Sequence, residues 1–391
     1  MHLWPSHTGS IVMRVTAAVM AALLAVAAQA GAREQARRMH DRIAGVPPSA
    51  TVLSAMETDI AAGRTQQAAM RAMDDPAFYA VTLKNLATPW TNRDQTVFAP
   101  LNDYTATVIG MVRDDVPFNQ LLSGDILYVG NAGLGLPAVS ASSNAHYDQL
   151  ESRGIDLRTG LQRTTQSATY GMPAAATAGV MTSRAAAESF FVAGTNRAMF
   201  RFTMLNHLCR NLEQTHDTTR PPDRVRQDVS RSPGGDARLF LNNCVGCHAG
   251  MDPMAQAFAY YNFDSAQGRL VYTAGSVQPK YSVNADTFRQ GYVTQDDAWE
   301  NRWRRGQNAL LGWDPALPGS GNGAKSLGQE LGNSDAFASC QVEKVFRTIC
   351  LRSPVDAADR DQISTMVNSF RASGYRMKQV FADAATYCMG P

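Results

Sequence analysis

The chain has 391 residues, of which 45% are hydrophobic and 18% are charged, a composition that excludes disordered and fibrous proteins and predicts a globule with one or two cores. Its 36 Lys and Arg residues nearly balance its 34 Asp and Glu residues, so the formal net charge is only +2. This balance gives no electrostatic reason to expect nucleic acid or an anionic membrane as a partner.

The N-terminal segment is typical of an export signal. Residues 12–28 are almost entirely apolar and lead into the small-x-small sequence Ala28-Gln29-Ala30. We therefore interpret residues 1–30 as a signal peptide and expect the mature chain to begin near Gly31. A translation start at Met13 would make this signal compact, and residues 1–12 would then be an upstream extension. The alternative is an uncleaved anchor, but the apolar stretch is shorter than the roughly 20 residues of a spanning helix. We expect a periplasmic or secreted protein without a membrane span in its mature chain.

Hydrophobic spacing predicts a helical N-terminal domain over residues 31–230. Residues 32–73 and 75–130 have apolar side chains at helical spacing, interrupted by Gly and Pro. Residues 131–170 are rich in Gly, Ser, Thr and Asn, so we expect a long surface connection there. Helix returns at 185–214, where apolar residues on more than one side predict a buried helix.

A second domain is expected over residues 231–391, because Pro-containing turns at 220–223 and 232–235 mark a boundary. Turn signals dominate its first half. Three helices are then predicted to close the chain, the first capped by Ser334 and the second ending at Gly374. We find no convincing strand, so the predicted fold class is mainly α, with a helical N-terminal domain followed by a second helical domain.

The pattern that carries chemistry is Cys244-Val245-Gly246-Cys247-His248. In such a Cys-x-x-Cys-His run, the two thiols form thioethers with the two vinyl groups of a haem, and the following His becomes the proximal iron ligand. Random placement of 6 Cys and 7 His in this chain would give the pattern with a chance of roughly two in a thousand. The sequence therefore predicts one covalent haem c, bound by Cys244 and Cys247, with His248 on the iron.

Two other sites compete for the same residues. A zinc site would need a second Cys-x-x-Cys or a His-x-x-x-His pair, and the sequence has neither. A thioredoxin-like dithiol belongs in a βαβ setting, which the predicted helices do not supply. Haem is favoured over both, since the expected export takes the chain to the compartment where bacteria attach c-type haem.

Four further cysteines are predicted to form two disulfides, since an oxidising compartment favours pairing of spare thiols. They are Cys209, Cys340, Cys350 and Cys388. Cys340 and Cys350 are expected on one helix, where ten residues span roughly 15 Å, so they are not expected to pair with each other. Cys209 is then joined to Cys340 or to Cys350, and either bond ties the N-terminal domain to the C-terminal helices. Free buried thiols are the alternative.

The residues around the motif resemble the haem-binding segment of the planctomycete-type cytochrome c proteins. The residues that carry the resemblance are the run Cys244 to Pro253, Phe258, Asn262-Phe263-Asp264, Gly268-Arg269, Gly323 to Leu331, Ser334 to Val342 and, more weakly, Pro117 to Asp125. In that family an Asp-Pro follows the haem His, then a Phe-Asp and a Gly, and a Ser-x-x-Phe-x-x-Cys helix start recurs downstream. The resemblance covers residues from about 95 to 390 and implies a helical cytochrome, with a cytochrome c-like helical haem domain over residues 231–391. It names no substrate.

The residue that faces His248 across the haem is left open by the sequence. Small class I cytochromes supply a Met from a downstream loop, yet this chain has no Met between Met254 and Met366. The candidates are Met251, Met254, Met366, Met377, Met389, His207 and His216. His207 is also readily interpreted as a core histidine, and the position opposite His248 can equally be open or filled by water.

Two tryptophans and three arginines are candidates for the haem surroundings. Trp299 and Trp303 could wall the haem, and Arg302, Arg304 and Arg305 could bind its propionates, because the guanidinium fork matches carboxylates. The competing interpretation is a solvated helix with two buried rings.

Two functions follow from these patterns. The first is an electron carrier, in which a six-coordinate haem exchanges electrons with a redox partner protein. The second is an enzyme with an open iron site that binds peroxide or another small ligand. Electron transfer is favoured, because the sequence shows no His-Arg pair at short spacing and no paired carboxylates near the motif. A haem that only stabilises the fold is a third possibility.

Overall fold

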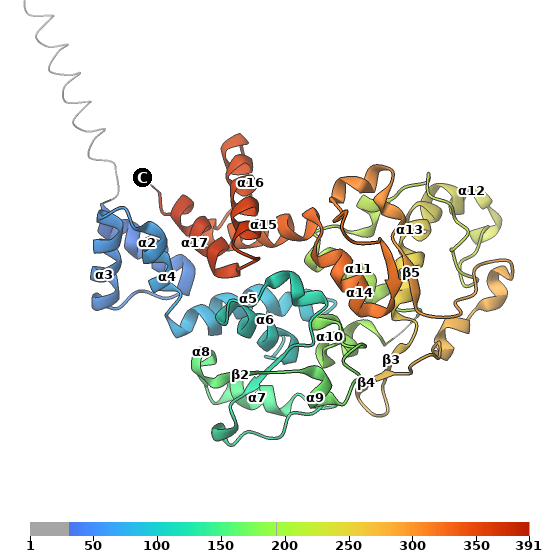
Figure 1. Ribbon diagram of the computed structural model, residues 1–391, viewed down its shortest axis with the longest axis horizontal. Helices are drawn as coiled ribbons and strands as arrows, with labels where there is room; N and C mark the ends of the chain where they lie inside the picture. The colour runs from blue at the N-terminus through green and yellow to red at the C-terminus, as the bar shows by residue number, and fades with distance from the viewer. Residues whose placement is uncertain (1–30, 193, 391) are drawn as a thin grey trace, which may run out of the picture.

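The computed structural model of the protein describes residues 31–192 and 194–390, so the expected signal peptide lies outside the described residues. The described chain is mainly helical, as the sequence predicts (Figure 1). The expectation that it has no strand is wrong, because short antiparallel strand pairs also form. Within these two ranges, no helix combines the length and the apolar character needed to cross a membrane.

The N-terminal half consists of short helices, 3-10 turns and one π-helical segment. They are α2 (Ala32–Ala44), α3 (Ala50–Ala61), α4 (Thr65–Ala72), η1 (Phe78–Leu83), α5 (Lys84–Ala87), η2 (Thr88–Thr91), α6 (Asp103–Arg113), η3 (Phe118–Leu122), η4 (Ala132–Leu134), α7 (Ala145–Ser152), α8 (Leu157–Gly160), α9 (Gln166–Tyr170), η5 (Gly179–Thr182), α10 (Arg184–Phe190), α11 (Arg197–His207) and η6 (Leu212–Thr215).

The C-terminal half has short helical segments first and longer helices last. They are η7 (Pro233–Gly235), α12 (Ala237–Leu239), η8 (Phe240–Cys244), α13 (Val245–Ala255), η9 (Gln256–Phe258), η10 (Pro279–Ser282), η11 (Ala285–Phe288), η12 (Arg302–Arg304), η13 (Gln307–Leu311), α14 (Gly323–Gly332), α15 (Asp335–Cys350), α16 (Ala357–Ala372) and α17 (Met377–Cys388). The strand pairs are β1 (Leu127–Gly130) with β2 (Leu161–Thr164), β3 (Tyr261–Asp264) with β4 (Arg269–Tyr272), and β5 (Ala298–Glu300) with β6 (Ser320–Asn322).

The start of α15 and the end of α16 lie where the sequence predicts. The backbone N–H of Phe337 donates to the Ser334 side chain at 3.1 Å, so Ser334 caps α15. Asp356 caps α16 in the same way, and the chain leaves that helix at Gly374, whose φ of +75° lies in the left-handed region that glycine tolerates best. These caps explain the confirmed helix boundaries.

Residues 131–170 are not the long surface connection that the polar composition predicts. They contain η4, α7, α8, β2 and α9. Tyr147 and Leu150 of α7 are buried, and the Tyr147 hydroxyl donates to the carbonyl of Tyr128 in β1 at 3.0 Å. A few buried side chains, such as those of Tyr147 and Leu150, therefore hold this segment in an ordered structure, although its composition is typical of loops.

One hydrophobic core joins both halves of the chain. A single cluster of buried residues extends from Ala36 in α2 to Ala385 in α17, and α17 packs against α2 and α4 as well as α15 (Figure 1). The residue ranges on either side of the expected boundary at 230/231 therefore share this core. α13 lies at the opposite end of the molecule from α2 and α17 in Figure 1.

Two disulfides fasten this arrangement. Cys209 is bonded to Cys340, with 5.3 Å between their Cα atoms, which is one of the two pairings expected from the sequence. Cys350, ten residues further along α15, is bonded to Cys388 at the end of α17. The first bond connects the segment after α11 to α15, so the expected link between the N-terminal part and the C-terminal helices is confirmed.

Candidate functional site

The Cys-x-x-Cys-His run lies where a π-helical turn continues into α13. Cys244 ends η8, and Cys247 and His248 follow three and four residues later, so helical spacing places all three on one side. All three are partly exposed, and 21% of the His248 side chain is accessible. The residues predicted to bind one cofactor are thus brought together at the surface.

Two glycines on the other side of α13 let the helix pack closely. A Cβ atom at Gly250 would lie 1.8 Å from Nε1 of the buried Trp303, and one at Gly246 would lie 2.6 Å from Nε2 of His216. Only glycine fits at these contacts. They hold the glycine side of α13 against the protein and leave Cys244 and His248 on the outer side.

Cys244 and Cys247 are the free thiols of the described chain, while the other four cysteines are in disulfides. Burial raises the pKa of the Cys247 thiol, and the negative charge of Glu213 raises it further. Dithiol oxidoreductases depend on a cysteine whose pKa is lowered, so this environment does not favour a nucleophilic dithiol.

His248 has a carboxylate partner inside the protein. Its Nδ1 lies 3.1 Å from Oδ1 of Asp252, one helical turn further along α13. Asp252 is buried, which by itself raises its pKa, but the charge of Arg197 and the hydrogen bond from His248 hold that pKa well below its usual value. An ionised carboxylate only accepts hydrogen bonds, so Nδ1 of His248 is the donor in this contact, and Nε2 is the ring nitrogen at which a metal would bind.

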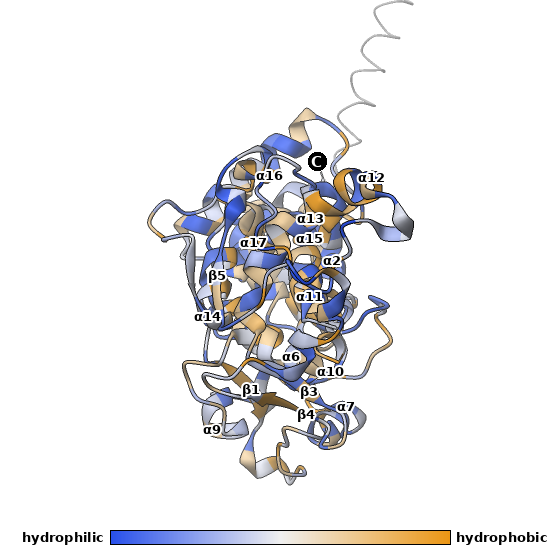
Figure 2. Cartoon of the chain, turned by 90° about the vertical axis from the view of Figure 1, so that its right-hand side faces the viewer, coloured by the Kyte–Doolittle hydropathy of each residue, from blue (hydrophilic) through white to orange (hydrophobic). Residues whose placement is uncertain are grey.

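Two apolar side chains are exposed next to the motif. Leu239 at the end of α12 is 44% exposed, and Leu241 in η8 is 56% exposed. Figure 2 shows hydrophobic colouring close to the α12 label. Two free thiols and an imidazole on one side of a helix are the groups that covalent attachment of a haem requires, and the adjacent leucines would contact its apolar ring.

The candidate ligands for the opposite side of the iron lie elsewhere. Met366 and Met377 are buried in α16 and α17, which lie to the left of α13 in Figure 1 and apart from it. His207 is 1% exposed, and its Nε2 lies 2.6 Å from the hydroxyl of Tyr104. These three side chains belong to the core, which disfavours them as iron ligands.

The other candidates are also engaged in packing. Met251 and Met254 are buried in the main hydrophobic cluster, and Met389 packs against its edge. His216 packs against Gly246, which helical spacing places about 160° around α13 from His248. The position opposite His248 is therefore not assigned to a side chain.

The tryptophans and arginines proposed as haem surroundings have other partners. Trp299 and Trp303 are buried, and Trp303 packs on the glycine side of α13. Arg302 binds Asp223 and Glu300, and Arg304 binds the buried Glu330 at 2.7 Å. Their guanidinium groups already have carboxylate partners, which disfavours them as propionate ligands. The two rings are buried as the competing interpretation expects, but the segment is not a solvated helix, because it forms β5 and the 3-10 turn η12. Arg305 lines a cavity of about 360 Å³ beside Arg302 and Arg304.

The structure adds Arg197 and Asp228 to the site, which the sequence analysis does not identify. Arg197 begins α11 and binds both Asp252 and Asp228. Asp252 belongs to the run Cys244 to Pro253, and its position four residues after His248 places it on the same helical face. No spacing rule connects Arg197 to residues so far along the chain.

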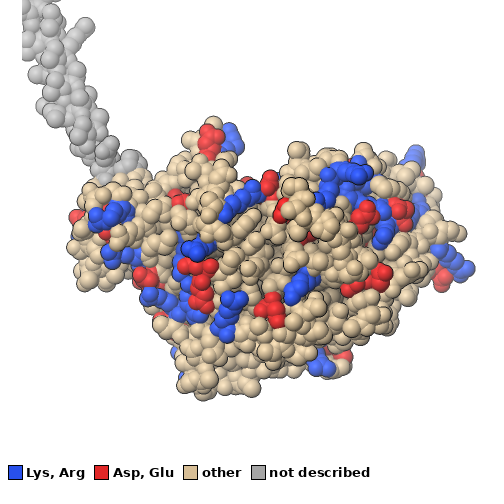
Figure 3. Space-filling model, viewed as in Figure 1, with Lys and Arg blue, Asp and Glu red and all other residues tan. Residues whose placement is uncertain are grey.

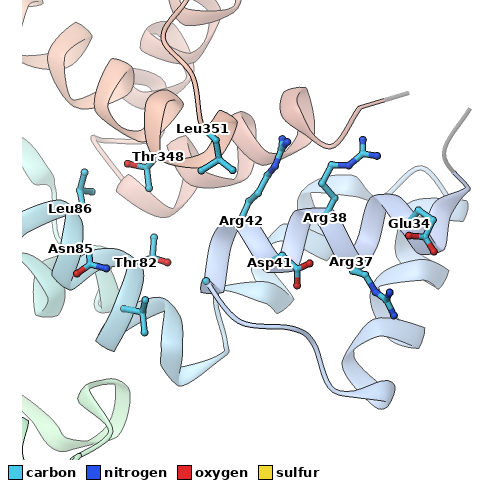
Figure 4. Close-up of a pocket in the computed structure, with 12 residues that line it drawn as sticks. Glu34, Arg37, Arg38, Asp41, Arg42, Thr82, Asn85, Leu86, Thr348 and Leu351 are labelled. Atoms are coloured by element: carbon cyan, nitrogen blue, oxygen red, sulfur yellow. The ribbon is translucent and has the colours of Figure 1, made fainter.

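A larger cavity, of about 740 Å³, lies at the junction of α2, η1, α5 and the end of α15 (Figure 4). Arg38 and Arg42 point from α2 toward the C-terminal part of the chain. They donate hydrogen bonds to the carbonyls of Met389 and Cys388. These arginines therefore bind the last carbonyls of the α17 region, and the cavity is not part of the site on α13.

In comparisons with known proteins, no family model, no curated protein and no solved structure matches the chain. Among the residues that the structure describes, no group of three or more His, Cys, Asp and Glu side chains is arranged to hold a metal ion, as a structural zinc site would require.

Proposed function

We propose that this protein is an exported monohaem c-type cytochrome that transfers electrons to or from a redox partner protein. Cys244 and Cys247 would carry the haem as thioethers, and His248 would bind its iron. The observation that carries the proposal is the pairing of two free thiols with an imidazole whose Nδ1 is bonded to Asp252, which leaves Nε2 for iron. The resemblance to planctomycete-type cytochromes supports the same assignment.

The electron-carrier role requires a redox group near the surface and no further catalytic residue. The motif is partly exposed, so a haem attached there would be within reach of a partner. Figure 3 shows acidic and basic side chains interspersed on the face it presents, with no extended area of one sign. This face gives no reason to assume a strongly charged partner.

We expect haem to remain attached after denaturation. The protein is produced with its export signal in a bacterial strain that matures c-type cytochromes, and the denatured chain is measured by mass spectrometry and by its pyridine haemochrome spectrum. Thioethers survive conditions that break coordination bonds, so the mass should exceed that of the polypeptide by one haem. A bare polypeptide mass would reject the proposed function.

Matched controls separate the roles of the motif residues. Cys244→Ser with Cys247→Ser should abolish covalent attachment. His248→Ala should retain at least one thioether but lose the proximal ligand and shift the Soret band. Cys209→Ser with Cys340→Ser serves as the comparison, because those cysteines are bonded to each other and should not affect attachment.

We expect the mature chain to begin at Gly31. The first described helix, α2, starts at Ala32, so cleavage there leaves every described helix intact. N-terminal sequencing of the exported protein tests this expectation. A purified protein that retains residues 13–30 and partitions with membranes would instead support the uncleaved anchor.

An enzyme with an open iron site is the second candidate. It is favoured by one observation, namely that His207, Met366 and Met377 are held in the core. Immediate binding of carbon monoxide by the ferrous protein, together with turnover of peroxide, would support this candidate over the electron carrier. Slow or absent carbon monoxide binding would support the electron carrier.

A further inference from the structure

We propose that Asp252, fixed by Arg197, is a positioning residue that makes His248 a strongly electron-donating iron ligand and so keeps the haem at a low reduction potential. This inference rests on the proposed function. It concerns Nδ1 of His248, which lies 3.1 Å from Asp252, and the groups that bind that carboxylate.

Asp252 cannot turn away from His248, because both of its oxygens are held. Arg197 donates from Nε to Oδ1 at 2.7 Å and from Nη2 to Oδ2 at 2.9 Å, a two-point contact with the carboxylate. The backbone N–H of Arg226 also donates to Oδ2, at 3.3 Å. With the Asp252 side chain fully buried, the carboxylate is fixed at hydrogen-bond distance from Nδ1 of His248.

Arg197 is in turn held by a second carboxylate. Its Nη1 and Nη2 bind the two oxygens of Asp228 at 2.6 and 2.9 Å. One positive charge, that of Arg197, therefore faces two negative charges, those of Asp252 and Asp228, so the charge of Asp252 is not fully neutralised. Arg226, the other guanidinium nearby, lies 4.1 Å over the ring of Tyr281 and donates to its carbonyl. The chain His248, Asp252, Arg197, Asp228 is therefore a connected network.

A carboxylate on Nδ1 changes what the imidazole gives to iron. The partner hydrogen bonds of a metal-bound His set its orientation and raise its basicity. A negatively charged acceptor draws the Nδ1 proton more strongly than a neutral carbonyl, so Nε2 donates more electron density. That donation favours ferric over ferrous iron, which lowers the reduction potential.

The inference is tested by comparing two variants that each remove one negative charge. Asp252→Asn keeps the shape of the side chain and offers His248 only a neutral carbonyl. Asp228→Asn removes a charge from the far side of Arg197 and leaves the bond to His248 in place. Midpoint potentials of the purified, haem-loaded proteins are measured by spectroelectrochemical titration.

We expect Asp252→Asn to raise the ferrous-to-ferric ratio at a fixed applied potential by about tenfold, which for one electron corresponds to ~59 mV. Asp228→Asn should change the ratio much less. Asp252→Glu, which restores a carboxylate, should return the potential toward that of the wild type. Equal changes in Asp252→Asn and Asp228→Asn, or no change in either, would overturn the inference.

A measurement on the wild type covers the case in which Asp252→Asn does not fold or load haem. In the reduced protein labelled with ¹⁵N-histidine, the proton on Nδ1 of His248 should resonate well downfield of the same proton in a haem peptide dissolved in water. A resonance at the haem-peptide position contradicts the inference. Failure of the proposed function looks different, because the wild type would then carry no covalent haem at all.

Discussion

Removal of the Cys209–Cys340 disulfide by replacing both cysteines with Ala is expected to lower the free energy of unfolding by about 5 kcal/mol. The bond joins residues 131 positions apart, so it removes a large loop-closure entropy from the unfolded chain. Cys340 is buried, and its truncation also leaves a small cavity in α15. Equilibrium denaturation in guanidinium chloride, followed by far-UV circular dichroism, measures the loss.

The second disulfide provides the matched comparison. Cys350 and Cys388 are 38 positions apart, so the same entropy argument gives a loss of about 4 kcal/mol when both are replaced by Ala. The order of the two losses is the informative result. If the shorter loop stabilises the protein more than the longer one, local packing at α15 and α17 dominates over chain entropy.

The local features of the fold could be predicted from the sequence. Helix starts and ends are fixed by neighbouring residues, and Ser334 and Gly374 mark their boundaries as expected. Cys340 and Cys350 lie on one helix, as expected from the sequence, and this placement correctly excludes a bond between them. The sequence alone could not show whether Cys209 pairs with Cys340 or with Cys350, because that choice depends on how α15 packs beside α11.

The features that depend on distant residues could not be predicted. Residues 131–170 have the composition of a loop, and only their packing onto β1 shows which side chains are buried anchors. Helical spacing explains why His248 and both cysteines of the motif lie on one side of the helix. The contact of Arg197 with Asp252 brings together residues 55 positions apart, and no periodic pattern indicates it.

The candidate iron ligands are a further example of features that the sequence alone could not predict. Met366, Met377 and His207 have the chemistry of ligands, and the sequence alone could not distinguish that use from burial in the core. In the structure, hydrophobic packing accounts for both methionines, and Tyr104 hydrogen-bonds the imidazole of His207. Packing in the core therefore accounts for these three side chains without any role as iron ligands.

Replacing Met366 or Met377 with Ala is therefore expected to destabilise the protein by about 2–5 kcal/mol and to leave the haem spectrum unchanged. Both side chains are almost fully buried, at 0% and 2% exposure, so their truncation removes core contacts and leaves cavities. Thermal unfolding measures the loss of stability. The ferric and ferrous visible spectra, recorded below the unfolding transition, report the iron ligands.

Met56→Ala is the matched control, because Met56 is equally buried in the same cluster and was never a candidate ligand. His207→Gln extends the test to the remaining buried candidate. If His207, Met366 and Met377 lie in the core as the structure places them, all four variants should keep the wild-type spin state and differ only in stability. Conversion of a single variant to a high-spin spectrum, with carbon monoxide then binding rapidly, would identify that residue as the iron ligand. It would also require α13 to approach that residue in the haem-loaded protein, so the spectrum tests the placement of the haem segment as well as the coordination of the iron.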